Sequence, residues 1–486
     1  MFFRKSKKTE KSEKSQKSRT FSASIRDRIN NFDINPVSMD SSIKSGLSAL
    51  RKQSRDLDKN NDYLKRFHTL LETHVVGNNG IKLQALFRDG KGELETKVNT
   101  MLEQNFNAWA READVAGKNH WVDIQRLVVR TVARDGEAFI RMVKGTNHNK
   151  WRFSLQLLDS ELVDEQYNDG PFEDGSRIKM GIKIDEWGKP LSYFFRTDLV
   201  EDGRKVINYQ GKNFIEIPAG DIIHVFLPVS MQQTRGIPWS HTVIRRLNIL
   251  GHYEESELVA ARTAACKMGF FKRKDYGETQ YTGEQLDEQG NYVQDAQPGS
   301  FEYLAPGVEF QSLNWEHDGS NYSAFVKQIL RGISSGLNVS YNSLNSDLEN
   351  VNFSSLRSGL LEEREFYKDI QAFVIRNFVS KVFKSWLETS AALSKEVNIS
   401  VRKVEKYLYP SFAGRRWQWI DPLKEVKASV IAVNNKLKSR SEIAAEQGRS
   451  VEDVFAELKN EEDQIEALGL SEDKFEEDLN EHDPAE

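Results

Sequence analysis

The stretch NSLNSDLENVNFSSLRSGLLEEREFYKDI, from Asn342 to Ile370, determines how the rest of the chain is interpreted. Its first dozen residues are mostly Asn, Ser, Asp and Glu, and none is Lys or Arg. A helix follows whose apolar residues recur every four positions, which is typical of a helix packed along one face. These residues are Phe366, Ile370, Val374, Phe378, Val382 and Trp386. From Ser354 to Glu388 the helix would be about 50 Å long, with a cation-free loop at its tip.

Two further helices are predicted before this loop. One lies in SNYSAFVKQILRGISSGLN, and a longer one extends from Pro238 to Met268, with Pro238 in its first turn. The longer helix ends in small residues, which would allow a neighbouring helix to come close: Ala260, Ala261, Ala264 and Ala265. A turn-rich segment, KDYGETQYTGEQLDEQGNYVQDAQPGSFEYLAPGVEF, separates the two. Long helices around a projecting insertion predict an elongated subunit.

The N-terminal half predicts an α+β domain. Three helices are expected in SSIKSGLSALRKQSRDLDKNNDYLKRFHTLLETHVVG, KVNTMLEQNFNAWARE and HWVDIQRLVVRTVARDG. After them the apolar period changes to two, and strands are expected in EAFIRMV, FSLQLL, IKMGIKID, LSYFFR and DIIHVF. In IKMGIKID one face would hold Ile178, Met180, Ile182 and Ile184, and the DEWGKP turn would return the chain as a hairpin. The result is a mainly antiparallel sheet with helices beside it.

Composition narrows the possible function classes. A chain of 486 residues has room for about three domains. Its net charge of −5 argues against a uniformly basic nucleic-acid-binding surface, so any DNA contact is expected to be local or weak. Cys266 is the only cysteine, which excludes an intrachain disulfide, and a small buried residue is expected there. No signal peptide is expected, because the N-terminus MFFRKSKKTEK has no apolar h-region. No membrane span is expected, because Arg376, Lys381 and Lys384 interrupt the most apolar helix.

The sequence lacks the common catalytic motifs. It contains no phosphate-binding G-x-x-x-x-G-K-[ST], no G-x-S-x-G, no H-E-x-x-H and no paired C-x-x-C. His241 and His252 would lie about 16 Å apart on one helix, too far to share a metal ion. An acidic group in LLDSELVDEQY is a weak candidate for a hard cation, and a solvated strand end is the favoured interpretation; it comprises Asp159, Glu161, Asp164 and Glu165. We therefore expect no catalytic residues, no metal and no cofactor.

One C-terminal segment has the rhythm of a helix-turn-helix DNA reader. In LKSRSEIAAEQGRSVEDVFAELKNE the second helix is acidic, the wrong sign for a phosphate-lined groove, so a helical hairpin is favoured, with Ser441 as a candidate cap. The termini differ in charge: residues 1–20 form a Lys/Ser-rich basic arm, and residues 461–486 form an acidic tail. Both are expected to be disordered.

Several segments, taken in order, resemble one known family. They are HVVGNNGIKLQ, LVVRTVARDGEAFIRMV, LQLLDSELVD, QTRGIPWSHTVIRRLNILGHYEESELVAARTAACKMGFF, LNSDLENVNFSSLRSGLLEEREFY and WQWIDPLKEVKASVIAVNNKLKSRSEIAAEQG. Together they resemble the lambda-type family of tailed-bacteriophage portal proteins, from about Ser45 to Leu458. Phe353 stands where the family pattern has Tyr.

The resemblance implies a portal-type subunit of defined parts. These would be an α/β wing (21–230), a first stem helix (231–270), a small clip (271–318), a second stem helix (319–337), a tunnel loop (338–353), a long core helix (354–392) and a helical C-terminal wing or crown region (393–460). Twelve copies would typically form a ring at one vertex of the virion capsid. The ring would nucleate head assembly in the host cytoplasm, connect head to tail, and pass double-stranded DNA in during packaging and out during ejection.

The resemblance also implies partners and site residues. The partners would be the terminase large subunit, the major capsid and scaffolding proteins, the head-completion or tail-connector proteins, and the DNA. The candidate channel residues in the tunnel loop are Asn342, Asn345, Asp347, Glu349, Asn350 and Asn352. The candidate partner-binding residues in the clip are Tyr276, Tyr281, Tyr292 and Phe301. Two alternatives are kept: a DNA-processing enzyme and a DNA-binding regulator.

Overall fold

The computed structural model describes most of the chain. The described residues are 38–197, 200–201, 204–205, 214–265, 269–273, 308–312, 322–349, 352–417, 422–446 and 451–468. The basic arm, most of the acidic tail, Cys266, Asn350 and the four clip candidates lie outside these ranges.

Helices and strands alternate unevenly along the chain. The helices are α1 (Met39–Asn60), α2 (Asp62–Leu71), α3 (Thr96–Trp109), α4 (Trp121–Asp135), α5 (Ile244–Ala265), α6 (Tyr322–Leu337), α7 (Tyr341–Asn345), α8 (Phe353–Val374), α9 (Ser380–Leu393), α10 (Pro422–Asn434), α11 (Arg440–Glu446) and α12 (Val451–Leu468). The strands are β1 (Lys82–Gln84), β2 (Glu137–Lys144), β3 (Phe153–Leu158), β4 (Arg177–Lys179), β5 (Ile182–Ile184), β6 (Pro190–Arg196), β7 (Val200–Glu201), β8 (Arg204–Lys205), β9 (Phe214–Pro218), β10 (Ile222–Phe226), β11 (Gly269–Arg273), β12 (Val308–Ser312) and β13 (Ser411–Ala413).

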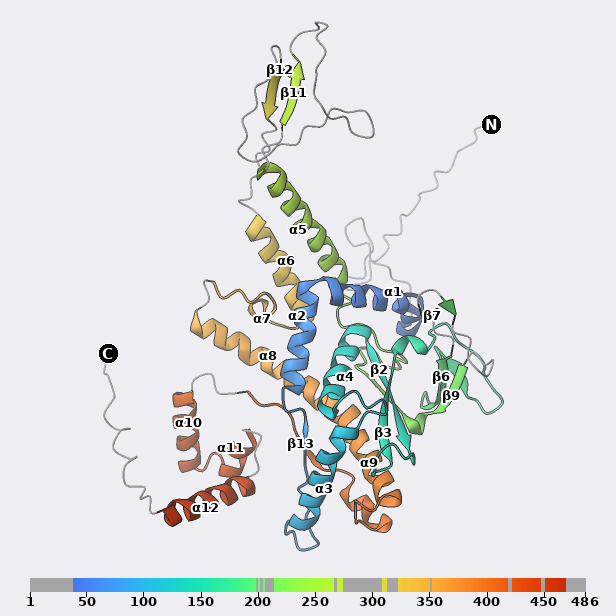
Figure 1. Ribbon diagram of the computed structural model, residues 1–486, viewed down its shortest axis with the longest axis vertical. Coiled ribbons are helices and arrows are strands. Elements are labelled where there is room, and N and C mark those ends of the chain that lie inside the picture. The colour runs from blue at the N-terminus through green and yellow to red at the C-terminus, as the bar shows by residue number, and fades with distance from the viewer. Residues whose placement is uncertain are drawn as a thin grey trace, which may run out of the picture.

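The molecule consists of a body with two projections, so the predicted mixed α+β fold is confirmed. The body contains the sheets together with α1 to α4, α8 and α9 (Figure 1). From it α5 and α6 rise side by side as a rod that ends below the β11 and β12 pair (Figure 1). The second projection, α10 to α12, lies beside the body near the C-terminus (Figure 1).

The main strands of the body form two antiparallel sheets rather than one, and β1–β13 and β7–β8 are separate two-stranded pairs. The strand order is β10-β2-β3 in the first and β4-β5-β6-β9 in the second. The prediction of IKMGIKID as one strand was wrong, because the chain reverses at Met180 and Gly181, whose φ values are 49° and 78°. β4 and β5 therefore pair with each other, and β5 pairs with β6 across the predicted DEWGKP turn.

An aromatic cluster joins the helices to the first sheet. Ring centroids of Phe106 lie 5.1 Å from those of Trp109 and Trp386, and the rings of Trp121 and Phe378 are 5.2 Å apart. These residues come from α3, α4 and the long C-terminal helix, and all of them are buried. Edge-on and offset aromatic pairs of this kind add about 0.5–1.5 kcal/mol each beyond the area they bury.

Two predicted helices have different boundaries in the structure. The first breaks at Asn61, whose extended backbone ends α1 and whose side chain accepts a hydrogen bond from the Leu64 N–H to begin α2. The helix predicted from Pro238 begins only at Ile244, because the Trp239 N–H donates to the Ala133 carbonyl and a turn follows. The short polar side chain of Asn61 favours such a cap over a helix interior.

The long helix behind the polar loop is present but is not a uniform α-helix. α8 and α9 are joined by a π-helical turn at Ile375–Val379. A stripe with steps of four residues drifts around an α-helix of 3.6 residues per turn, and a wider π turn reverses part of that drift. Accordingly Ile370, Val374, Phe378, Val382 and Trp386 all remain buried.

The C-terminal region first returns to the body and then leaves it. β13 pairs with β1 antiparallel, and α11 and α12 then form the predicted helical hairpin. Ser439 caps α11, because its Oγ accepts from the Glu442 N–H at 3.1 Å; Ser441, the candidate cap, lies inside the helix. α12 continues to Leu468, so the part of the predicted disordered tail from 461 to 468 is helical.

Candidate channel loop and the contacts that hold it

The polar segment between α6 and α8 is more structured than a free loop. It begins with the helical turn α7, capped by Ser340, whose Oγ accepts from the Ser343 N–H at 3.1 Å. Leu344 in that turn is buried in the main core. Ser346 then takes a left-handed conformation, with φ of 55°, and directs the chain away from the turn. The first half of the segment is therefore anchored to the body.

Asp347 is bound within the subunit. Its carboxylate accepts from the Glu349 N–H at 2.9 Å and from the Tyr341 hydroxyl at 2.9 Å, and it forms an ion pair with Lys327 of α6 at 3.1 Å. The Glu349 N–H, Tyr341 and Lys327 hold the pKa of Asp347 below its ordinary value. The polar segment itself contains no Lys or Arg. Lys327 of α6 lies next to it, and its positive charge is paired with Asp347.

The other loop candidates divide into two groups. Asn345 donates to the Tyr341 hydroxyl at 3.1 Å, and Asn352 caps α8 by accepting from the Ser355 N–H at 2.7 Å. Asn342 is half-buried, whereas Glu349 is exposed. Three of the residues proposed to face a channel therefore hold the loop itself: Asn345, Asp347 and Asn352. The sequence did not predict that Lys327 and Tyr341 bind Asp347, because these contacts form only when the turn brings the residues together.

A buried carboxylate fastens the loop to the long helix. Glu363 of α8 accepts from the Ser343 Oγ at 2.7 Å and from the Tyr367 hydroxyl at 2.6 Å. Burial and the nearby Glu363 charge raise the pKa of Tyr367, so this hydroxyl stays protonated and continues to donate. Arg66 of α2 adds a bond from its Nε to the Ser343 carbonyl at 3.2 Å.

The same anchor continues to the C-terminal return strand through His74. Its ring stacks on Tyr367 at 4.7 Å, and its Nδ1 accepts from the Trp417 Nε1–H at 3.0 Å. Burial and the Arg415 charge lower the pKa of His74 to about 4, which keeps the ring neutral and able to accept. The loop, α8 and the return of the chain to the body thus form one connected structure.

The second buried polar centre lies in the body, at Glu137 of β2. This residue is fully buried and bonded to Arg51 Nη2 at 2.8 Å, Arg235 Nη2 at 2.6 Å and His224 Nε2 at 2.9 Å. Burial alone would raise the pKa of Glu137, but Arg235, His224 and Arg51 hold it below its ordinary value. The centre therefore ties α1, β2, β10 and the approach to α5 together around one charge.

Two of the sequence segments that carried the resemblance meet at this centre. Gly136, in VARDGEAF, has φ of 89°, and a Cβ there would lie 2.3 Å from the Ile237 backbone. Gly236, in QTRGIPW, is equally close, since its added Cβ would lie 2.1 Å from the Gly136 carbonyl oxygen. Only glycine permits this crossing, which places Arg235 and the Gly236 N–H against Glu137.

Three residues of the acidic group that was considered for cation binding make contacts within the chain instead. Asp159 and Glu161 pair with Arg55 of α1 at 2.7 and 3.4 Å, and Asp164 accepts from the Gln166 N–H in its own turn. Within the described residues no group of three or more His, Cys, Asp or Glu side chains is placed to hold a metal ion. Over the same ranges no helix is long and apolar enough to span a bilayer.

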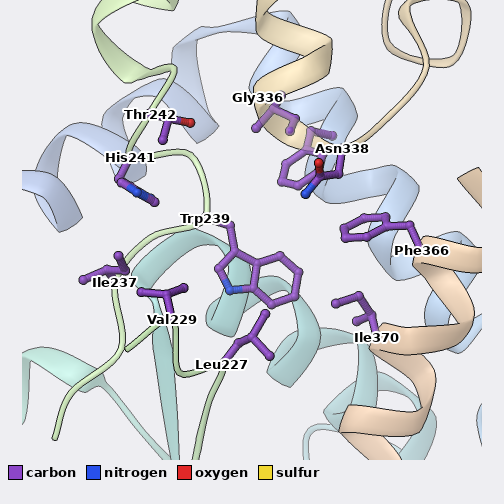
Figure 2. Close-up of a pocket in the computed structure, with 12 residues that line it drawn as sticks. Leu227, Val229, Ile237, Trp239, His241, Thr242, Gly336, Asn338, Phe366 and Ile370 are labelled. Carbon is purple, nitrogen blue, oxygen red and sulfur yellow. The ribbon is translucent and has the colours of Figure 1, made fainter. Parts of the chain in front are cut away.

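A pocket of about 190 Å³ lies where the segment before α5, the end of α6 and the long helix α8 meet. Figure 2 shows Trp239 at its centre, facing Phe366 and Ile370 of α8 across from the end of α6 at Gly336 and Asn338. His241 also lines the pocket, and its Nδ1 lies 2.9 Å from the Pro238 carbonyl oxygen. It precedes α5, whereas His252 lies on that helix. The pocket lies beside the junction of the three parts, with no catalytic constellation among its lining residues.

Comparisons with known proteins identify the family of this chain. The family described as phage portal protein, lambda family, matches residues 26–371. The probable portal protein of Halomonas phage phiHAP-1 is 31% identical over 459 residues, which cover 93% of this chain and 88% of that protein. Portal protein B of Escherichia phage lambda is 23% identical over 470 residues, covering 89% of this chain and 87% of that one.

A solved structure titled as the virion of a native gene transfer agent particle also aligns. It covers 83% of this chain and 93% of its own, at 13% identity and a TM-score of 0.46. The family match extends over more than two thirds of the chain and includes strands β1 to β12, the helices α5 and α6 and the polar loop. The chain belongs to the lambda family of phage portal proteins, whose members are structural rather than catalytic proteins.

Proposed function

We propose that this protein forms the ring at the unique capsid vertex, in the neck of the virion, through which a terminase packages double-stranded DNA and through which the DNA later leaves. The ring is a homo-oligomer, expected to be a dodecamer, that assembles in the host cytoplasm, nucleates the head and connects it to the tail. Family membership supports the proposal, since the matched relatives are named portal proteins.

The observation that carries the proposal is the exposed apolar surface of the rod. On α5, Ile249, Leu258 and Val259 are 55%, 71% and 58% exposed, and Phe325 on α6 is 50% exposed. Beyond Leu250, no described side chain of α5 is buried. A long helix with apolar groups on several sides gains stability when neighbours pack on each side, and a head-to-tail ring provides two neighbours to every subunit.

The parts of the subunit take the following assignments. Residues 21–230 form the wing, 231–270 and 319–337 the stem, 271–318 the clip, 338–353 the tunnel loop, 354–392 the core helix and 393–460 the C-terminal wing and crown. The two-helix rod that ends at the β11 and β12 pair supports the stem and clip assignment (Figure 1). The clip meets the terminase large subunit during packaging and the head-completion or tail-connector proteins afterwards, through Tyr276, Tyr281, Tyr292 and Phe301. The rest of the ring meets the major capsid and scaffolding proteins.

The loop from Asn342 to Asn352 faces the DNA without gripping it. Each lysine or arginine that neutralises a phosphate adds a salt-dependent hold, repeated in every subunit of the ring, that a sliding duplex must break. The ion pair between Asp347 and Lys327 supports this role because it keeps the lysine charge occupied. Exposed Glu349, together with Leu348 at 64% exposure, is then the surface presented to the duplex.

Electron microscopy of the purified full-length protein tests the proposal. Negatively stained particles should be rings with a central hole, and light scattering should give a mass of about twelve subunits at high protein concentration. A uniform monomer at both low and high concentration would contradict it. The variant Leu258→Ser with Val259→Ser provides an internal control, because it should shift the same preparation toward monomers.

A further inference from the structure

The C-terminal helices α10 to α12 have no interior of their own. Among the described residues of 422–446 and 451–468, no side chain is buried. Figure 1 shows the three helices beside the body, with α11 and α12 packed together and α10 next to them. α10 and α11 have 13 and 7 residues, and isolated helices of that length are marginal in water unless an apolar face is covered. A partner that covers these faces would complete this part of the fold.

One exposed apolar stripe lies on α10. Leu423, Val426 and Val430 are spaced by three and four residues, which places them on one face, and they are 62%, 42% and 52% exposed. Lys427 follows Leu423 by four positions and precedes Val430 by three, so it lies beside the same stripe. The face is therefore apolar with a basic flank.

A second stripe lies on α12. Phe455 and Leu458 are 49% and 48% exposed and three residues apart. Glu461 and Glu462 follow Leu458 by three and four positions and extend the same face with negative charge. This face is apolar with an acidic flank, the counterpart of the one on α10.

The overall charge of the two regions follows the charge of their faces: the region of α10 and α11 is basic and that of α12 is acidic. Residues 422–446 contain five Lys or Arg against three Glu, whereas residues 451–468 contain seven Asp or Glu against one Lys. Two faces of opposite charge on one subunit are complementary, so the α12 face of one copy can pack on the α10 face of another. In a ring this is a head-to-tail contact, in which each subunit offers one face to each neighbour.

We infer that α12 of each subunit packs its Phe455 and Leu458 face on the Leu423, Val426 and Val430 face of α10 in the next subunit. The occupant is a second copy of this chain, identified by the complementary apolar and charged faces. The inference rests on the proposed ring and adds to it a closed belt of C-terminal helices. It also explains why α10 and α12 leave their stripes exposed within one chain.

Disulfide capture between two single-cysteine proteins tests the pairing. In a full-length background with Cys266→Ser, one protein carries Val430→Cys and the other Leu458→Cys. Co-assembled and oxidised, the mixture should give a disulfide-linked dimer on non-reducing gels, whereas either protein alone should stay a single chain. A protein carrying both changes should give a ladder of multiples of one subunit. Leu393→Cys, at a 56% exposed position on α9, replaces Val430→Cys as the matched control and should give no dimer.

The outcomes separate this inference from the proposed function. Rings that form without the mixed dimer would overturn the α10 and α12 pairing and leave the ring intact. A double-cysteine protein that closes only within one chain, seen as a faster monomer band, would overturn it too. Monomers at every concentration would overturn both proposals.

The charged flanks give an independent readout. Glu461→Lys with Glu462→Lys should reduce the mixed dimer, and adding Lys427→Glu on the partner protein should restore it. Higher salt should lower the yield of the original pair, because exposed charges are screened. An equal dimer yield in all three combinations would exclude the charge-matched contact.

Discussion

The wing interior and the two projections bury their groups in opposite ways. In the wing, Glu137 is fully buried, and Arg51, Arg235 and His224 of the same chain satisfy it. In the rod and the C-terminal helices, apolar side chains such as Leu258 and Phe455 remain exposed. The Glu137 centre is therefore satisfied within one chain, whereas these apolar groups would be covered only by contacts from other chains.

This difference separates folding from assembly. A body with its own core can fold at any protein concentration, while parts that gain contacts only in an oligomer are stabilised by mass action. Substitutions in the wing should lower the stability of the monomer, and substitutions in the projections should change the oligomer population instead. The predictions below test that separation, beginning with the largest effect.

Removing the buried carboxylate should damage the wing most. Glu137→Ala leaves Arg51 and Arg235 buried without their counter-charge. Breaking a buried pair in this way costs about 3–5 kcal/mol of the free energy of unfolding. Urea unfolding followed by circular dichroism measures the loss.

An exposed pair in the same wing provides the control for Glu137. Asp221→Asn breaks the surface ion pair with Lys144 and should change the free energy of unfolding by no more than about 1 kcal/mol. If the two variants were equally stable, the buried centre would contribute nothing that the surface pair does not.

In the α5 and α6 rod, a substitution should change assembly more than the stability of the monomer. Leu258→Ser removes an apolar group that is 71% exposed in the single chain, so monomer stability should change by less than about 0.5 kcal/mol. The ring population should fall sharply, because the same group contacts a neighbour in the proposed assembly. Sedimentation velocity at several concentrations measures it, with His252→Ser, another exposed change on α5, as the comparison. Unchanged ring content in Leu258→Ser would place this residue outside the interface.

The polar loop has both internal contacts and an exposed surface. Two variants with the same charge change distinguish the loss of the Asp347 contacts from the effect of added positive charge. Asp347→Lys should loosen the loop, because it places a second ammonium group beside Lys327 and removes the acceptor of Tyr341. Glu349→Lys adds the same charge at an exposed position where no such side-chain anchor is lost. Faster amide hydrogen exchange in residues 340–349 is expected only for Asp347→Lys, and slower packaging for both. Equal exchange in the two variants would mean that the Asp347 contacts do not hold the loop.

The sequence predicted elements well where one periodicity dominated. The α4 helix, the following strand β2 and the second stem helix α6 lie where their patterns placed them. It failed where a local backbone reversal overrode the pattern, as at Met180 and Gly181, whose neighbours alternate as one strand would. Alternating apolar residues describe a face but do not reveal where the chain turns back.

The site was less predictable than the fold, for a physical reason. The polar composition of the loop was visible, but the partner of Asp347 is Lys327, twenty positions earlier on another helix. Glu137 likewise read as an ordinary strand residue, although it is paired with residues from α1 and from the approach to α5. Contacts between distant positions depend on the packing of the elements, which one sequence does not specify.

The last prediction concerns pH and the link between the polar loop and the chain around Trp417. Burial and Arg415 lower the pKa of His74 to about 4, below its unfolded value of about 6.5. Between these values the unfolded chain binds a proton at this site that the folded chain does not, so stability should fall as the pH decreases from about 6.5 to 4.

His74→Gln keeps an acceptor for Trp417 but removes this titration, and should flatten the pH dependence of stability between about pH 6.5 and 4. His68 and His224, whose pKa values burial also lowers, are present in both proteins and contribute equally to each curve. Thermal melts of both proteins across that range, with His252→Gln as the exposed comparison, measure the difference. Parallel curves for the wild type and His74→Gln would mean that His74 titrates alike in the folded and unfolded chains, and that its stacking on Tyr367 does not depend on a neutral ring.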